Sequence, residues 1–384
     1  MQTSQNRILT THVGSLPRSE PVVAALERRE NDANADSAEF DAAIRQAVAD
    51  VVRRQVDVGI DIVSDGENSK ISYATYVKDR LTGFADEGPT EGAKPHLDLQ
   101  PFPALRKKMA VLNGARRFKR VACIGPVAVR SLDLLGKDLD NMRQARTASA
   151  PNEVFLNSAS PGVIASFLPN QYYRSHEAYI EAVAEAMREE YRAIVAAGFV
   201  LQVDCPDLAM SRHTAFQDLS EDQFLKRAGF HVEMLNHALS GISPDMIRIH
   251  VCWGNYEGPH THDIDLSKIV KTVLSVNARA LSLEAANPRH EHEWTVWRDL
   301  KLSDDKILLP GVIDTSTNYI EHPELVAQRI VRFADVVGRE RVIAGTDCGF
   351  GTSAGHGKID PQIAYLKLRS LVEGASTASK QLWA

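Results

Sequence analysis

Short apolar runs alternate with longer amphipathic segments along most of the chain. Nine of these runs carry the aliphatic and β-branched residues that buried strands prefer; they are Ile8–Val13, Ile60–Ser64, Val121–Ile124, Val154–Asn157, Phe199–Val203, Ile247–Val251, Ala280–Leu283, Ile307–Pro310 and Val342–Ala344. Three intervening segments repeat apolar residues at helical spacing, over Asp41–Val58, His176–Ala197 and His322–Val337, and a glycine follows each of them. Because glycine after such a pattern is the usual C-cap, these segments are predicted to be helices that end there.

Strand, helix and strand repeated many times favour parallel pairing with right-handed crossovers, which gives a doubly wound sheet or a closed (β/α)8 barrel. A length of 384 residues suits a barrel with inserted loops. Nine strands are one too many, and Val121–Ile124 is the best candidate for a strand outside the barrel, because it follows the Pro-, Gly- and charge-rich stretch Asp86–Pro103. We therefore predict an α/β fold, a single (β/α)8 TIM-barrel domain over residues 1–384 with an insertion around 84–125.

Composition and charge exclude several classes of protein. The apolar share of 44% and the charged share of 24% are ordinary for a globular domain, and a net charge of −6 argues against nucleic-acid binding. No apolar stretch approaches the roughly 20 residues of a membrane span, and the first residues lack the apolar core of a secretion signal. Four cysteines in a chain of this length do not make a disulfide framework. We expect a cytoplasmic protein with no nucleic-acid or membrane partner and with reduced thiols; a homo-oligomer is compatible with the sequence.

Metal-binding residue types recur where predicted strands end, which is where a barrel builds its active site. The most informative motif is His250-Val251-Cys252, because residues two apart on a strand project to the same side. Glu284 and Cys348 stand at the ends of two later strands. Each residue taken alone is more often a buried or hydrogen-bonded side chain than a ligand. Together, the imidazole, the carboxylate and the two thiols suit a borderline-soft ion, for which zinc is the commonest candidate.

At these positions the chain resembles the catalytic barrel of the cobalamin-independent methionine synthase family. Thr10–Arg18 resembles the family's T-T-x-x-G-S-x-P opening, and Val63–Glu67 its glutamate-bearing strand end. Leu201–Pro206 is similar to its I-D-E-P segment, while the H-x-C motif, Glu284 and the late Asp347-Cys348-Gly349 match its zinc ligands in order. The similarity spreads over nearly the whole chain and points to a single-barrel branch, within a wider group that includes epoxyalkane:coenzyme M transferases.

The resemblance implies a methyltransferase of methionine biosynthesis, in which a zinc-bound thiolate attacks the methyl group. It implies that Zn²⁺ is held by His250, Cys252, Glu284 and Cys348, and that the small-molecule partners are a thiol, homocysteine in this family, and a methyl donor. It further implies that Gly14 and Ser15 receive the substrate carboxylate and that Glu67 and Asp204 receive its amino group. His290 is a candidate proton relay, and Asp347 is a catalytic candidate that could equally only orient its loop.

The chain departs from the family pattern in two places. The two-barrel synthases have an N-terminal barrel with no counterpart in these 384 residues, which leaves methylfolate, methylcobalamin and a sulfonium open as methyl donors. Cys205 stands where the family usually has glutamate; we interpret it as a passive pocket residue, and Cys123 as a core residue.

The segment Trp253–Asp265 is additional sequence rich in histidine and glycine. Its pair His260 and His262, like the pair His290 and His292, is interpreted as part of a solvated, charged loop rather than as a second metal site. The rival functions are alkyl or epoxyalkane transfer to another thiol such as coenzyme M, hydrolysis by a metallohydrolase on the same barrel, and a binding protein with a structural zinc.

Overall fold

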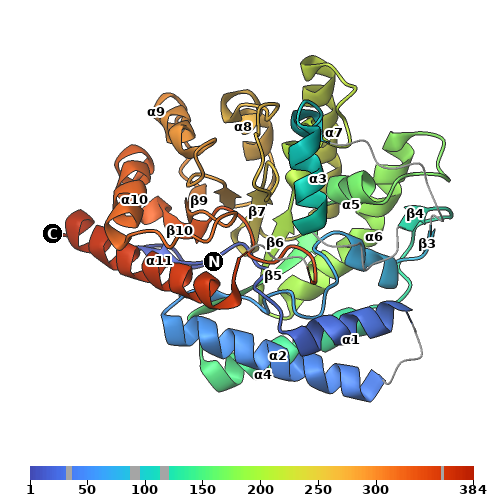
Figure 1. Ribbon diagram of the computed structural model, residues 1–384, viewed down its shortest axis with the longest axis horizontal. Helices are drawn as coiled ribbons and strands as arrows, with labels where there is room; N and C mark the ends of the chain where they lie inside the picture. Colours follow the sequence, from blue (N-terminus) through green and yellow to red (C-terminus); the bar gives the residue numbers. More distant parts are fainter. Residues whose placement is uncertain (32–36, 87–95, 113–120, 356–358) are drawn as a thin grey trace.

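The computed structural model describes residues 1–31, 37–86, 96–112, 121–355 and 359–384. Its centre is a sheet of eight parallel strands that forms a nearly closed barrel surrounded by helices (Figure 1). The strands are β1 (Leu9–Thr10), β2 (Ile62–Val63), β5 (Glu153–Ala159), β6 (Val200–Asp204), β7 (Ile247–Val251), β8 (Ala280–Leu283), β9 (Ile307–Ile313) and β10 (Ile343–Thr346). Their order in the sheet, β1-β10-β9-β8-β7-β6-β5-β2, follows the chain around the barrel. The predicted (β/α)8 fold is therefore confirmed.

Side-chain contacts join β1 to β2, where the sheet would otherwise be open. The Thr10 amide and hydroxyl both donate to Asp61 Oδ2, at 2.9 and 3.0 Å, and the Thr11 hydroxyl donates to the Ile62 carbonyl at 3.1 Å. The side chains thus supply hydrogen bonds where the backbone ladder is missing.

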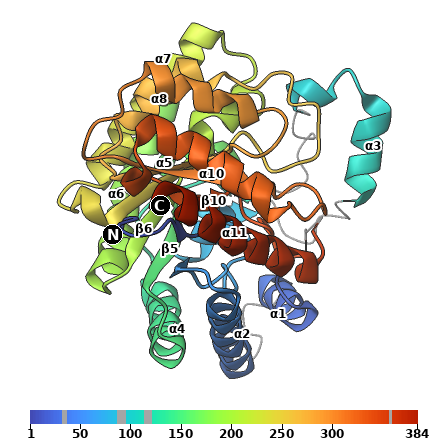
Figure 2. The same ribbon diagram turned by 90° about the vertical axis from the view of Figure 1, so that its left-hand side faces the viewer.

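The helices outside the barrel are α1 (Glu20–Asn31), α2 (Ser37–Val58), α4 (Asp133–Ser149), α5 (Pro161–Phe167), α6 (His176–Ala196), α7 (Glu221–Ala238), α8 (Leu266–Leu274), α9 (Val296–Asp299), α10 (Pro323–Val337) and α11 (Pro361–Leu382). Figures 1 and 2 show α1, α2 and α4 side by side on one flank. The three predicted helices correspond to α2, α6 and α10. The glycines that follow them, Gly59, Gly198 and Gly338, have φ of +98°, +82° and +95°, conformations that favour glycine at a helix end.

A two-stranded antiparallel sheet lies outside the barrel, as predicted for Val121–Ile124. It pairs β3 (Phe84–Asp86) with β4 (Val121–Cys123). Of the insertion predicted around 84–125, residues 87–95 and 113–120 lie outside the described part of the chain. Between them stand a 3₁₀ turn, η2 (Leu97–Leu99), and α3 (Pro103–Leu112), which lies to one side of the barrel in Figure 2. The division into one domain with an insertion stays a prediction.

The barrel interior has an apolar layer and a polar layer. The apolar layer is a separate buried cluster of Leu9, Ile62, Phe155, Val200, Ala280, Ile307, Leu309 and Ile343. The Arg248 guanidinium stacks 3.8 Å from the centre of the Phe155 ring and donates to Gln202 Oε1 at 2.7 Å and to the Thr11 hydroxyl at 2.9 Å. The apolar side chains fill the barrel beneath this arginine, so a ligand site is expected at the carboxyl ends of the strands.

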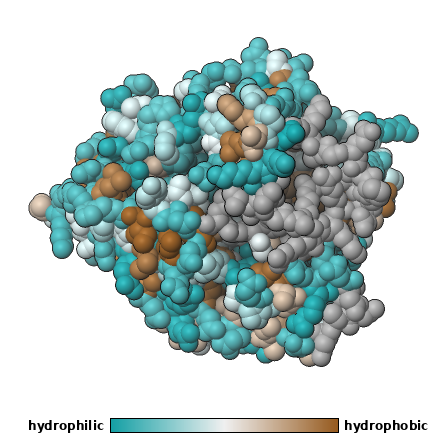
Figure 3. All heavy atoms as spheres, in the orientation of Figure 1, coloured by the Kyte–Doolittle hydropathy of each residue, from teal (hydrophilic) through white to brown (hydrophobic). Residues whose placement is uncertain are grey.

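The surface agrees with the composition of an ordinary globular domain. Figure 3 shows a mainly hydrophilic face with small, separate apolar areas. Within the described part of the chain, no helix combines the length and the apolar character needed to cross a bilayer.

Candidate metal centre

Three of the four predicted metal ligands meet at the mouth of the barrel. His250 lies in β7, Cys252 directly follows it, and Cys348 follows β10. The two sulfur atoms are 3.7 Å apart, and one ligand atom from each of the three side chains lies within 4.8 Å of the other two. All three residues are buried, with 3 to 6% of their surface exposed. They converge because the carboxyl ends of parallel strands share one rim of the barrel.

The electrostatics of this cluster favour a bound cation. Neither ring nitrogen of His250 has a hydrogen-bond partner among the residues described. Burial, and then Arg248, lower the pKa of His250 to about 3, so the ring is neutral and offers a lone pair. The contact with Cys348, together with burial, raises the pKa of the Cys252 thiol well above its usual value. A coordinated metal reverses that effect, because it deprotonates a ligating thiol. An orphaned imidazole beside two thiols therefore fits a zinc ion.

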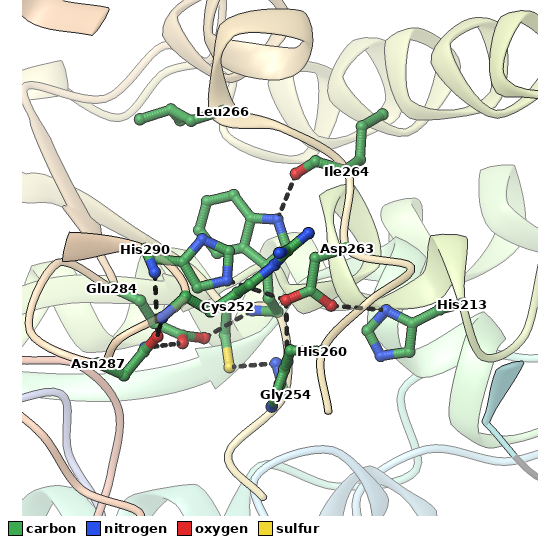
Figure 4. A network of polar contacts seen from close by, with 12 residues as sticks. His213, Cys252, Gly254, His260, Asp263, Ile264, Leu266, Glu284, Asn287 and His290 are labelled. Carbon is green, nitrogen blue, oxygen red and sulfur yellow. Dashed lines mark hydrogen bonds and ion pairs between the residues drawn. The ribbon is translucent and has the colours of Figure 1, made fainter. Parts of the chain in front are cut away.

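Glu284, the fourth predicted ligand, follows β8 directly and lies beside Cys252 (Figure 4). Its carboxylate accepts one hydrogen bond from the Trp253 amide and one from the Asn287 side chain, both at 2.7 Å. Glu284 is 4% exposed, and burial raises the pKa of its carboxyl group. It is not one of the three residues whose ligand atoms lie within 4.8 Å of each other. The carboxylate is thus held next to the cluster by two other donors.

Asp347 fixes the segment that carries Glu284. Its Oδ1 accepts from the amides of Ala285 and Ala286, both at 2.8 Å, and its Oδ2 accepts from the amide of Asn287 at 2.9 Å. A Cβ on Gly311 would lie 2.3 Å from Asp347 Oδ1, so only glycine fits opposite this carboxylate. The sequence pattern gave no signal for Gly311 or Asn287. Asp347 therefore contacts the loop backbone and does not line the main cavity described next.

A cavity of about 690 Å³ lies over the sulfur atoms. Six predicted site residues line it: Ser15, Glu67, Asp204, His250, Cys252 and Cys348. Its walls also include Tyr73, Phe167, Met210 and Tyr256, which sequence reasoning did not identify. These residues carry no distinguishing sequence pattern, and only the fold brings them together. The cavity thus brings thiols, carboxylates and mainly apolar side chains together.

Glu67 and Asp204 are the two predicted carboxylates that line this cavity. Asp204 accepts from the Gln202 side chain at 2.7 Å and from the Asn157 side chain at 3.0 Å, and burial raises its pKa to about 6. Burial likewise raises the pKa of Glu67 to about 8; nearby Lys70 opposes this effect and Asp204 adds to it. Glu67 Oε2 is buried without a hydrogen-bond partner in the described structure. The pair is therefore suited to receive a cationic hydrogen-bond donor.

Gly14 and Ser15 stand in the segment that follows β1. Gly14 has φ of +146°, and a Cβ there would be 2.4 Å from the Asn157 side chain, so glycine allows Asn157 to reach Asp204. Ser15 lines the cavity, whereas Gly14 is not among its lining residues.

Two other candidates are buried away from this cavity. Cys205 is fully buried, and its thiol faces the Val203 carbonyl at 3.5 Å. His290 is 2% exposed and bonds to Asp263 and Glu293.

The fold and the site define a (β/α)8-barrel protein with a thiol-rich centre at the barrel mouth. Residues 8–90 and 147–375 match the sequence model described as the catalytic domain of cobalamin-independent synthase. The chain belongs to this family and is an enzyme of the methyltransferase class.

Curated relatives cover nearly the whole chain. The methionine synthase of Saccharolobus solfataricus is 24% identical over 376 residues, which is 97% of this chain and 95% of the relative. That of Thermococcus kodakarensis is 25% identical over 380 residues, with 97% and 94% covered.

Solved structures share the fold over the same extent. A B12-independent methionine synthase from Shewanella sp. W3-18-1, in complex with selenomethionine, has a TM-score of 0.72 at 20% identity and covers 98% of this chain and 99% of its own. A putative vitamin-B12 independent methionine synthase from Listeria monocytogenes has a TM-score of 0.67 at 17% identity, with 97% and 98% covered.

Proposed function

We propose that this enzyme methylates the thiol of homocysteine to give methionine, and that it does so with Zn²⁺ held by His250, Cys252, Cys348 and Glu284. The observation that carries the proposal is the meeting of three ligands in a cavity that Glu67 and Asp204 also line. The similarity to methionine synthases over 97% of the chain supports the same activity.

Zn²⁺ bound there would lower the pKa of a thiol that reaches it, so that the substrate sulfur is a nucleophile at neutral pH. The protein's own part is to present the ligands. The Trp253 amide and the Asn287 side chain hold the Glu284 carboxylate beside Cys252. Because a carboxylate with two other donors is easily released, we propose that Glu284 is the ligand that exchanges when substrate arrives.

Glu67 and Asp204 would orient the amino acid in the same cavity. An ammonium group placed between Glu67 and Asp204 would offset the burial that raises the pKa of both carboxyl groups, so binding and ionisation of the carboxylates support each other. Ser15 lines the same cavity, and its hydroxyl is suited to donate to the substrate carboxylate. These contacts would direct the side-chain sulfur of homocysteine toward Cys252 and Cys348.

The cavity chemistry favours homocysteine over a sulfonate thiol such as coenzyme M. A sulfonate would require cationic partners. The described residues that line the cavity include no lysine or arginine. Arg18, the nearest candidate in sequence, donates to the backbone carbonyls of Glu67 and Gly351, at 3.1 and 2.6 Å. Its guanidinium also lies 3.8 Å from Glu67 Oε2, so its charge is balanced by that carboxylate. No observation favours hydrolysis or a purely structural zinc.

The test is a methyl-transfer assay on zinc-loaded enzyme, with homocysteine or coenzyme M as acceptor and methylfolate, methylcobalamin or a methylsulfonium as donor. We expect methionine from one of these donors. We expect Glu67→Gln to raise KM for homocysteine about tenfold or more while zinc content stays unchanged, because it removes a charged partner of the ammonium. Methylation of coenzyme M without any methionine would overturn the proposal.

A further inference from the structure

A second group of metal-ligating side chains lies beside the candidate zinc site. The sequence predicts solvated histidine pairs in this region, and His262 and His292 are indeed exposed. His260 and His290, however, are buried, with 9% and 2% of their surface exposed. The prediction is wrong for these two, because the chain turns them inward onto Asp263. His260, Asp263 and His290 each offer a ligand atom, and the three atoms lie within 4.8 Å of one another.

Both imidazole rings point one nitrogen at the same carboxylate oxygen. His260 Nδ1 lies 2.9 Å and His290 Nε2 3.0 Å from Asp263 Oδ2. The opposite nitrogens also face acceptors: His260 Nε2 is 3.0 Å from the Tyr256 carbonyl, and His290 Nδ1 is 2.8 Å from Glu293 Oε2. A neutral ring has a single N–H. If the ring donates through the nitrogen that faces away from Asp263, the lone pair of its other nitrogen faces the Asp263 carboxylate. That arrangement requires a cation between the nitrogen and the carboxylate oxygen.

A third histidine beside Asp263 supports the same conclusion independently. His213 is fully buried, and its Nδ1 lies 3.2 Å from Asp263 Oδ1 (Figure 4). The contact is not a hydrogen bond. Among the residues described, both His213 nitrogens and Asp263 Oδ1 lack a hydrogen-bond partner. The buried Oδ1 of Asp263 is therefore left without a hydrogen bond beside His213, while Oδ2 faces His260 and His290. A cation bound by this carboxylate would offset its charge.

We propose that His260, Asp263 and His290 bind a second divalent transition-metal cation, separate from the thiol-ligated site. Two imidazoles and one carboxylate form a ligand set that suits Zn²⁺, Co²⁺ or Ni²⁺. The outward hydrogen bonds to a carbonyl and to a carboxylate are the arrangement that orients metal-bound histidines. A cavity of about 340 Å³, lined by His260 and Glu284 among others, gives the ion a path to the cluster. The ion would join the loop after Cys252 to the loop after Glu284.

Protons are the competing occupant of the cluster. Although burial opposes a charge, the hydrogen bonds to Asp263 and Glu293 raise the pKa of His290 to about 10, so two protonated rings would satisfy the same acceptors. A metal titration separates the two accounts, because protonated imidazoles bind no cobalt.

The experiment is a Co²⁺ titration of the metal-stripped full chain, followed by absorption and by the bound metal retained after gel filtration. We expect two equivalents, of which only one develops a thiolate-to-cobalt charge-transfer band. Asp263→Asn and His260→Ala should each remove one equivalent and keep that band, whereas the Cys252→Ala/Cys348→Ala double variant should lose the band and keep the other equivalent. His262→Ala, an exposed neighbour, is the matched control and should keep both. Saturation of the wild type at one equivalent, or two equivalents retained in both single variants, would overturn the proposal. The outcome does not depend on methyl transfer.

Discussion

The sulfur atoms of Cys252 and Cys348 lie 3.7 Å apart, although 96 residues separate the two cysteines in the chain. Two intervening strands, β8 and β9, separate β7 from β10 in the sheet, so the two thiols approach each other across the barrel mouth rather than along one edge. Two buried thiols in contact gain little from each other as neutral groups. Their proximity is best explained by a shared ion.

Replacing Cys348 with alanine should remove the metal from the thiol-rich site. We expect zinc affinity to fall by more than about tenfold, because loss of a direct ligand costs at least as much as loss of a group that only orients one. Zinc per chain, measured by elemental analysis after dialysis against a weak chelator, checks this. Cys123→Ala is the control, since Cys123 is buried in β4, outside the cluster. Equal zinc retention in the two variants would remove Cys348 from the ligand set.

Replacing Asp347 with asparagine should loosen the loop that carries Glu284. The asparagine side chain accepts only through its oxygen, whereas both oxygens of Asp347 accept from backbone amides. The NH2 group of asparagine would therefore face a backbone N–H group that it cannot bond. Leaving buried donors unpaired costs about 1–3 kcal/mol of the free energy of unfolding. Urea denaturation measures the change, and Asp335→Asn, an exposed site on α10, should leave it unchanged. A wild-type unfolding midpoint in Asp347→Asn would contradict this role.

The same substitution at two glycines should have opposite effects. Gly14→Ala would press a methyl group against Asn157 and should destabilise the protein by about 1–3 kcal/mol, with a higher KM for homocysteine because Asn157 holds Asp204. Gly229→Ala lies within α7 with open space around it and should stabilise by about 0.5–1 kcal/mol. Thermal unfolding of both variants gives the comparison. The argument fails if Gly14→Ala is as stable as the wild type.

Stability should fall with rising pH because of Glu67. Burial raises the pKa of its carboxyl group in the folded protein to about 8, well above the value of an unfolded chain. The unfolded state therefore binds fewer protons than the folded state between about pH 4.5 and pH 8. The stabilising contribution of Glu67 is complete below this window and is lost as the pH rises through it. The slope is at most about 1.4 kcal/mol per pH unit.

Glu67→Gln removes that slope. The variant should therefore become more stable relative to the wild type as the pH rises from 5 to 8. Urea denaturation at both pH values, without substrate, measures it. Parallel pH profiles for the two proteins would show that Glu67 does not titrate as described.

The barrel could be predicted because its signals are local. Strand runs such as Ile247–Val251 are buried on both faces, and the glycines after α2, α6 and α10 end those helices. The strand Phe84–Asp86 was not predicted, because three residues are too short to carry a recognisable alternation.

For the site, the rule that strand ends share a rim predicted that Cys252 and Cys348 would meet. Contacts between loops did not follow from the pattern. Asp347 bonding to Ala285–Asn287, and His260 turning inward with φ of +52°, depend on individual loop conformations that periodicity does not encode.

The most direct test of the central claim is zinc-edge X-ray absorption on the zinc-loaded Asp263→Asn variant, in which only the thiol-rich site should hold metal. We predict two sulfur neighbours per zinc in the free enzyme and three after homocysteine is added. A sulfur count that stays the same with saturating homocysteine, or a free-enzyme zinc with no sulfur neighbour, would contradict the account.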